Sequence, residues 1–334
     1  MEARRLKFDD DAQRLEARPP LTAARTPELS IVIVTWNSGR WIDRCLGAIP
    51  AACDGVAYEV VIYDNASADA TPQLVADRGA RVMRAASNDG FAAGTNRAVV
   101  ETGGRYVFLL NPDCELAPHA LASLVKFLDA HPKLAGAAPL LDGDGQREFQ
   151  LRRLPTLRSL VGEIFAFHKL FPKNAHTAHH RYRNLDLTEP RRIEQPAAAA
   201  LLLRREVFDE VGPFDEQFAP AWFEDVDYCR RLAAAGKEVW VVPAARATHA
   251  GGASLEHVPF ERFTEVWYRN MWRYARKWFS AGRAEALRWL IVGGMLLRIV
   301  AAAIGVAHPE VGRRRAMRAY AGVLKNAWSR WGAR

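Results

Sequence analysis

The 334-residue chain is poor in cysteine and lacks the features of a secreted protein. Its four cysteines show no CxxC spacing, which excludes the common zinc and thiol-redox motifs and favours reduced, packed thiols over disulfides. Residues 1–11 carry charges of both signs and no apolar segment, so we expect no secretory signal and a cytoplasmic location. The apolar run before Arg298 has only 9 residues, which is too short to span a bilayer.

A glycine-rich dinucleotide fingerprint is also missing. Thr35-Trp36-Asn37-Ser38-Gly39 follows the first expected strand in place of GxGxxG, which argues against a dinucleotide-dependent oxidoreductase. Apolar residues make up 49% of the chain, enough for a substantial core. Strands are expected at residues 29–35, 58–63, 81–84, 106–110, 134–141, 197–203 and 238–242. Because helical patterns separate these runs, the order predicts an α/β fold with a mostly parallel central sheet flanked by helices.

Basic residues are concentrated towards the C-terminal end. Residues 257–334 hold 15 Lys and Arg against 4 Asp and Glu, whereas residues 1–256 hold 31 against 34. Trp and Tyr interleave with these cations, which is typical of peripheral contact with an anionic membrane rather than with nucleic acid. Packing of the same helices on the rest of the protein is the alternative. We therefore expect a charged arm over residues 1–27, a main domain over 28–256 and a helical, basic and aromatic extension over 257–334.

Carboxylates stand at two places that suit chemistry. Asp113 follows an apolar strand and Pro112, so it lies at the sheet edge where open α/β sheets bind ligands and where a carboxylate can hold a divalent cation. Glu224 and Asp225 begin a later helical pattern, a position that the helix dipole alone also favours for acids. With His249 further along, these groups indicate an enzyme that transfers a group from a nucleoside diphosphate.

Five short segments resemble those of the family-2 glycosyltransferases, in order and spacing, over residues 28–255. They are Thr35-Trp36-Asn37, Tyr63-Asp64-Asn65-Ala66-Ser67, Asn88-Asp89-Gly90-Phe91-Ala92-Ala93-Gly94-Thr95-Asn96, Asn111-Pro112-Asp113 and Phe223-Glu224-Asp225-Val226-Asp227. Residues 152–156 and 212–216 are similar to the bacterial rhamnosyltransferase-like branch, which builds lipid-linked cell-surface polysaccharides. The resemblance implies a GT-A fold with a catalytic domain over residues 28–256, an inverting mechanism, a nucleoside-diphosphate sugar donor and Mg²⁺ or Mn²⁺.

The resemblance also implies roles for individual residues. Asp225 would be the catalytic base, and Glu224 would share that role or bind the acceptor. Asp113 and His249 would hold the metal, with Asn111 in place of the first Asp of the family's common Asp-x-Asp signature. The donor would contact Thr35, Asn37, Asp64, Asn65, Asn88, Gly90, Asn96, Asn111 and Asp113.

Among these donor contacts, Asp64 would accept a hydrogen bond from the N3–H of uracil or thymine, an edge that the two bases share. An Asx turn is the structural alternative for this residue.

The expected function is transfer of a sugar, with L-rhamnose from dTDP-rhamnose preferred, to a saccharide acceptor in cell-surface polysaccharide synthesis. The acceptor would be linked to a polyprenyl diphosphate, and the protein would lie peripherally on the inner face of the cytoplasmic membrane. A UDP-hexose-dependent transferase of the same family and a non-catalytic nucleotide-sugar-binding subunit are the alternatives.

Overall fold

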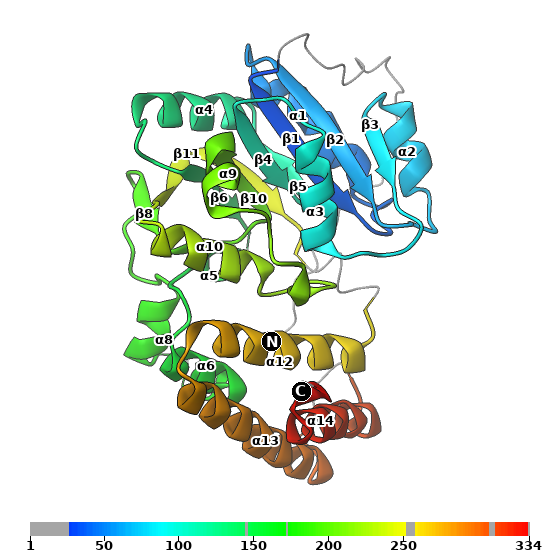
Figure 1. Ribbon diagram of the computed structural model, residues 1–334, viewed down its shortest axis with the longest axis vertical. Coiled ribbons are helices and arrows are strands. Elements are labelled where there is room, and N and C mark those ends of the chain that lie inside the picture. Colours follow the sequence, from blue (N-terminus) through cyan, green and yellow to red (C-terminus); the bar gives the residue numbers. More distant parts are fainter. Residues whose placement is uncertain (1–26, 144–145, 172, 252–257, 307–310, 333–334) are drawn as a thin grey trace.

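The computed structural model describes residues 27–143, 146–171, 173–251, 258–306 and 311–332 (Figure 1). The expected charged arm over residues 1–27, apart from its last residue, lies outside the described part of the chain. So does the expected domain boundary at 256/257.

A mixed sheet forms the centre of the molecule. Its strands are β1 (Leu29–Thr35), β2 (Tyr58–Asp64), β3 (Arg81–Arg84), β4 (Tyr106–Leu110), β5 (Cys114–Leu116), β6 (Gly136–Asp142), β8 (Arg191–Ile193), β10 (Ala200–Arg204) and β11 (Val239–His249). Within the described residues their order is β3-β2-β1-β4-β10-β6-β11-β5, with β8 paired to β11. Pairing is parallel from β3 through β4 and between β6 and β11, while β10 runs antiparallel to both of its neighbours.

Helices cover both faces of this sheet. They are α1 (Ile42–Cys53), α2 (Thr71–Asp77), α3 (Phe91–Val100), α4 (Ala120–Ala130), α9 (Arg205–Val211) and α10 (Glu224–Ala234). Ile31 and Ile33 of β1 join one core with α1 and α4, whereas Val32 joins a second core with α3 and α10. This two-sided burial explains why β1 reads as an unbroken apolar run and why its strand could be predicted.

A third layer lies beyond α10 (Figure 1). It contains α6 (Leu157–Ile164), α7 (Phe167–Leu170), α8 (Ala175–His180), α12 (Phe260–Trp278), α13 (Ala281–Ala303) and α14 (Arg313–Trp328), with the short elements α5 (Gln146–Gln150), β7 (Leu151–Arg152), β9 (Gln195–Pro196), η1 (Glu216–Phe218) and η2 (Arg330–Gly332) nearby. Phe218 and Phe223 from the sheet domain join the core of this layer. The expected helical extension is therefore present, and it packs on the domain that precedes it.

Several strand boundaries differ from the sequence interpretation: for example, the strand expected over residues 197–203 is β10, Ala200–Arg204. The strand expected from residue 134 begins at Gly136, and the strand expected to end at residue 242 continues to His249. β5 was not predicted, because its three residues carry too little periodicity to stand out. The four cysteines are buried and unpaired, which confirms the expectation of reduced, packed thiols.

Candidate active site

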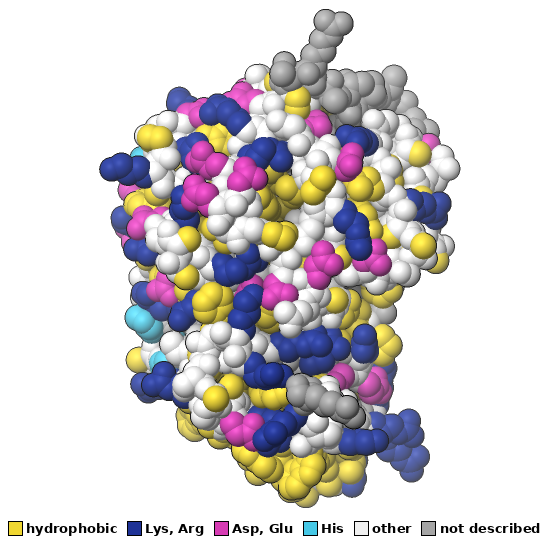
Figure 2. Space-filling view, viewed as in Figure 1, with side chains coloured by type: hydrophobic (Ala, Val, Ile, Leu, Met, Phe, Trp, Pro, Cys, Tyr) yellow, Lys and Arg dark blue, Asp and Glu magenta, His cyan; other side chains and the backbone are white. Residues whose placement is uncertain are grey.

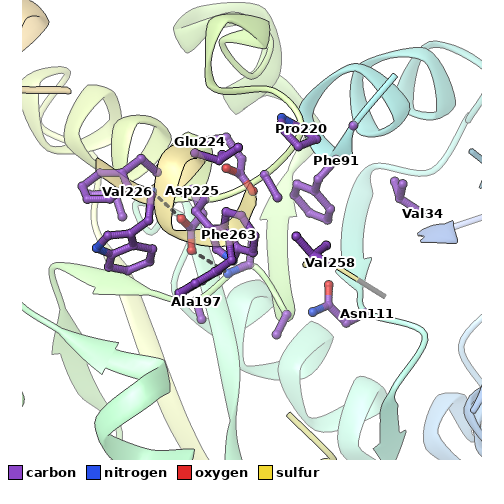
Figure 3. Close-up of a pocket in the computed structure, with 18 of the residues that line it drawn as sticks. Val34, Phe91, Asn111, Ala197, Pro220, Glu224, Asp225, Val226, Val258 and Phe263 are labelled. Atoms are coloured by element: carbon purple, nitrogen blue, oxygen red, sulfur yellow. Dashed lines mark hydrogen bonds between the residues drawn. The ribbon is translucent and has the colours of Figure 1, made fainter. Parts of the chain in front are cut away.

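The carboxyl ends of β1, β2 and β4 meet at one edge of the sheet, beside a cavity of about 590 Å³ (Figure 3). Of the residues expected at the site, the lining of this cavity includes Thr35, Asn65, Asn88, Gly90, Asn111, Glu224 and Asp225. Parallel pairing places the ends of β2, β1 and β4 side by side, and the strand order reverses at β1, between β2 and β4. The sheet topology therefore brings donor-loop residues and acidic residues to one cavity.

The loop before α3 forms one wall of this cavity. The Asn65 side chain accepts a hydrogen bond from the backbone N–H of Asp89 (3.0 Å) and donates to the carbonyl of Gly90 (3.3 Å). Gly90 has a φ of +92°, and a Cβ there would lie 2.6 Å from the carbonyl oxygen of Pro220. Glycine is required because the backbone of Pro220 packs directly against this position.

Asp64 lies at the end of β2, but it is 1% exposed and does not line the cavity. Its carboxylate accepts hydrogen bonds from the Thr35 hydroxyl (2.9 Å) and from the backbone N–H of Ser67 (3.1 Å). Arg84 lies 3.7 Å from the same carboxylate. In this arrangement Asp64 ties the ends of β1 and β2 and the following turn together.

Asn37 and Asn96 do not line the cavity either. The Asn37 side chain accepts from the N–H of Ala68 (2.8 Å). The amide of Asn96 donates to the carbonyl of Phe214 (2.9 Å) and accepts from its N–H (2.8 Å). The described contacts of both residues hold neighbouring loops in place.

Asp113 and His249 meet because β5 pairs with the end of β11. The register sets His249 opposite Cys114, so that the His249 Nε2 atom lies 3.3 Å from a carboxylate oxygen of Asp113. Both side chains are nearly buried, and Phe149, which also lines the cavity, stacks on the His249 ring at 5.4 Å. Asp113, Cys114 and His249 form a group that could hold a metal ion among the described residues.

Cys114 is a poor member of that group. Burial raises the pKa of its thiol well above the ordinary value, and its S–H donates to the carbonyl of Ala199 (3.4 Å). A carboxylate oxygen and an imidazole nitrogen remain, a donor pair that suits Mn²⁺ and tolerates Mg²⁺ when phosphate and water oxygens complete the shell.

Two acidic side chains from the start of α10 point into the cavity (Figure 3). Burial and the neighbouring charge of Asp225 raise the pKa of Glu224 well above its ordinary value, and one Glu224 carboxylate oxygen is buried without a hydrogen-bond partner. Burial also raises the pKa of Asp225, opposed by hydrogen bonds from the N–H groups of Val226 and Ala198 and by the charge of Arg152. Raised pKa values and an unpaired oxygen are costly to stability and typical of a functional site.

The backbone before this acidic pair is held in an unusual conformation. Trp222 and Phe223 have φ values of +71° and +77°, which side chains with a Cβ rarely adopt. The buried Asn270 side chain donates to the carbonyls of Phe218 (2.6 Å), Ala221 (3.0 Å) and Trp222 (3.0 Å). Asn270 therefore fixes the loop that carries the acidic pair.

The sequence interpretation missed the part that α12 plays in the site. Phe263, Val266, Trp267 and Met271 of this helix line the cavity. A signal was present: Val266, Asn270 and Tyr274 are spaced four residues apart on one buried face, and a polar residue in such a row indicates a buried hydrogen-bonding role. Helix α12 therefore completes the site.

Comparisons with known proteins agree with this arrangement. The family model described as glycosyl transferase family 2 matches residues 30–212. The mannosyltransferase PcManGT from Pyrobaculum calidifontis, solved with GDP-Man and Mn²⁺, superposes with a TM-score of 0.52 at 16% identity, covering 97% of this chain and 92% of that one. The chain thus belongs to glycosyl transferase family 2, and its fold is of the GT-A type.

Two curated relatives are similar to this chain over different lengths. An N-acetylglucosaminyl-diphospho-decaprenol L-rhamnosyltransferase from Mycobacterium tuberculosis is 27% identical over 288 residues, which are 82% of this chain and 92% of that protein. The succinoglycan biosynthesis protein ExoO from Rhizobium meliloti is 32% identical over 148 residues, 41% of this chain and 42% of that protein.

Proposed function

We propose that the protein transfers L-rhamnose from dTDP-rhamnose to a saccharide linked to a polyprenyl diphosphate. The observation that carries the proposal is a pair of carboxylates, buried Glu224 and partly buried Asp225, in a cavity whose other wall is the donor-side loop around Gly90. The choice of sugar and acceptor rests on the similarity to the mycobacterial rhamnosyltransferase.

In this proposal Asp225 is the base. Inverting transfer needs a carboxylate on the face of the sugar opposite the leaving group, where it takes the proton of the acceptor hydroxyl as that oxygen attacks the anomeric carbon. Burial raises the pKa of Asp225, which makes its carboxylate a better proton acceptor near neutral pH. The hydrogen bonds from Val226 and Ala198 orient the carboxylate, and Glu224 positions the acceptor beside it.

On the donor side, Thr35, Asn65, Asn88, Gly90 and Asn111 line the cavity, and in this proposal they would surround the nucleotide. Asp64 would accept a hydrogen bond from the nucleobase of the donor. Because its side chain is buried, this contact would require the turn at Ser67 to rearrange. The positions of Asn37 and Asn96 suit support of the same loops, because both amides are engaged by neighbouring backbone.

Asp113 and His249 would hold Mg²⁺ or Mn²⁺. The bound ion would offset negative charge on the departing nucleoside diphosphate. Neither side chain lines the cavity, but they lie 3.3 Å apart, and Phe149, which stacks on the His249 ring, is part of the cavity lining.

The basic and aromatic C-terminal helices fit a protein that works peripherally on the inner face of the cytoplasmic membrane. A polyprenyl diphosphate resides in that membrane, and cations near the surface are attracted by its anionic lipids. We propose this cytoplasmic, membrane-peripheral location on the composition of α12 to α14 and on the acceptor of the mycobacterial relative.

A donor panel tests the proposal. The protein is assayed for transfer from dTDP-rhamnose and UDP-hexoses to a soluble, short-chain N-acetylglucosaminyl diphosphate, with and without Mn²⁺, and its melting temperature is followed with dTDP, UDP and GDP. We expect transfer from dTDP-rhamnose and stabilisation by dTDP. Transfer from a UDP-hexose instead would support the second donor class, and nucleotide binding without any transfer would support a non-catalytic subunit.

A further inference from the structure

The outward face of α13 carries large apolar side chains over most of its length. Its exposed residues after Arg283 are Ala286, Trp289, Leu296, Leu297 and Val300, and Ile304 follows directly after the helix. Leu297 is 60% exposed, Val300 58% and Ile304 75%. Apart from the adjacent Leu296 and Leu297, successive positions from residue 286 to 304 are three, four or seven residues apart, which is about one or two helical turns. They therefore form one stripe, about 27 Å long at 1.5 Å per residue. We call this set of six residues the α13 stripe.

The opposite face of α13 is packed into the protein. Leu287, Ile291 and Met295 are fully buried in the core shared with α12 and α14. Two of the three guanidinium groups of this helix also turn inward: Arg288 donates to the carbonyl of Ala327 (2.8 Å) and Arg298 to that of Ile164 (3.1 Å). Charge inward and apolar surface outward is the reverse of a water-facing helix.

This packing decides how α13 can meet a membrane. By length and composition the helix could cross a bilayer, and 39% of its apolar window is buried. Crossing would pull Arg288 and Arg298 away from their carbonyl partners into hydrocarbon, which is expensive. A helix that keeps its inner contacts and offers only an apolar outer face fits an orientation in the plane of the interface.

The surroundings of the stripe have the chemistry of an anionic lipid surface. Trp328 of α14 is 66% exposed and contacts Trp289 edge to face at 5.2 Å, and Trp prefers the headgroup level. The exposed charged residues on α13 and α14 among those described are basic: Arg283, Arg313, Arg314, Arg315, Arg318 and Lys325. Figure 2 shows Lys and Arg beside an apolar area at the end of the molecule formed by this layer.

We call these six exposed basic residues the basic rim, and acidic side chains that could pair with them are scarce. Among the described residues of α13 and α14 the one acid is Glu285, which pairs with Arg288, while Arg315 pairs with Glu261 of α12. Two copies of the chain joined through the stripe would bring two basic rims together without acids between them. Lipid phosphate offers the missing negative charge, and acyl chains offer the apolar partner.

We propose that the α13 stripe docks the protein on an anionic membrane by shallow insertion in the interface plane, with Trp289 and Trp328 at headgroup depth. Burial of apolar side chains drives this docking, and the basic rim orients it. The proposal specifies how the membrane contact of the proposed function is made, and it rests on that function for its choice of a lipid-linked acceptor. Because α13 packs on α12, whose other residues line the cavity, the reaction site would lie about two helix diameters, roughly 20 Å, from the lipid surface.

The test uses the full chain and a double variant, Leu297→Asp with Val300→Asp. Both side chains are mostly exposed, so the melting temperature should hold. Val100→Asp is the matched control, since Val100 is 81% exposed on α3 and far from the stripe in the fold. Co-sedimentation is measured with vesicles of equal parts phosphatidylglycerol and phosphatidylcholine and with phosphatidylcholine alone, at low and high salt.

We expect the wild type and Val100→Asp to bind the anionic vesicles. The double variant should bind at least about tenfold more weakly, because two apolar side chains that would be buried in the membrane are replaced by charged ones. High salt should weaken the wild type without abolishing binding. Equal binding by the double variant, or no binding by the wild type, would overturn the proposal. So would light scattering that shows a dimer of the wild type converted to a monomer by the double variant, because a second copy would then occupy the stripe.

The soluble-acceptor assay is run alongside on the same preparations. Transfer by the double variant should match that of the wild type, since the stripe is remote from the cavity. Vesicle binding without transfer in the wild type would reject the proposed function and leave the docking surface standing. Transfer without vesicle binding would support the proposed function and reject the docking surface.

Discussion

Replacing Asn270 by alanine removes the hydrogen bonds that hold the loop before the acidic pair. Its amide has two N–H groups, which serve three buried carbonyls at 2.6 to 3.0 Å. A buried polar group left without a partner costs about 1–3 kcal/mol, and two such losses total about 2–6 kcal/mol. Part of this loss in stability is offset if the backbone at Trp222 and Phe223 relaxes, because each positive φ value destabilises the folded protein by about 1–2 kcal/mol. We therefore expect Asn270→Ala to lower the free energy of unfolding by about 2–4 kcal/mol.

Activity should fall as well, because Glu224 and Asp225 directly follow the released loop. A displacement of about 1 Å in a reacting group can cost about a hundredfold in rate. Urea unfolding and turnover with saturating donor measure the two effects. Asn270→Asp tests the mechanism, since it keeps the size of the side chain and the oxygen that Arg269 and Arg273 approach at 3.4 Å but removes both donors, and it should also destabilise the loop. Asn326→Ala, on half-exposed α14 surface, is the matched control, and wild-type behaviour of Asn270→Asp would refute the reasoning.

Three further changes probe the site. Asp113→Asn should abolish the extra stabilisation that Mn²⁺ adds to bound dTDP in thermal melts while the fold persists; an unchanged metal effect would remove Asp113 from the metal site. For Glu224→Gln we expect a gain in melting temperature that grows as the pH rises above 4.5, the ordinary pKa of Glu. Burial raises the pKa of Glu224 in the folded protein, so above pH 4.5 the carboxyl ionises more readily in the unfolded chain and the wild type loses stability. A gain confined to acidic pH would contradict this. Gly90→Ala should cost at least about 1–2 kcal/mol in urea unfolding, since φ is +92° and the new Cβ would meet Pro220, and a neutral outcome would show that the loop yields.

Much of the fold could be predicted because the strands are buried on both faces. The unbroken apolar runs at Leu29–Thr35 and Tyr106–Leu110 are not typical of surface segments and predict buried strands. The carboxyl ends of these strands indicate the sheet edge where the cavity lies. Some of the residues that the family motifs pointed to line that cavity, among them Asn65, Gly90 and Glu224, whereas others such as Asp64 and Asn96 do not. Element ends were less certain, as the extension of β11 to His249 shows.

The site itself depends on contacts that are distant in sequence. Asn270 donates to carbonyls about 50 residues earlier; its place on an apolar helix face indicates a buried hydrogen-bonding role, but nothing local identifies the partners. Asn96 was expected at the nucleotide, but its amide is engaged by Phe214, 118 residues later. His249 meets Asp113 through the three-residue strand β5, which is too short to predict.

The central claim is inverting transfer from dTDP-rhamnose with Asp225 as the base, and proton NMR of the reaction tests it most directly. The wild type and Asp225→Asn are incubated with dTDP-rhamnose, Mn²⁺ and the soluble acceptor, and the anomeric signals of donor and product are followed in time. We expect a product with anomeric configuration opposite to that of the donor, formed at least about a hundredfold more slowly by the variant, with donor affinity little changed. A product of retained configuration, or equal rates for the two proteins, would contradict the account.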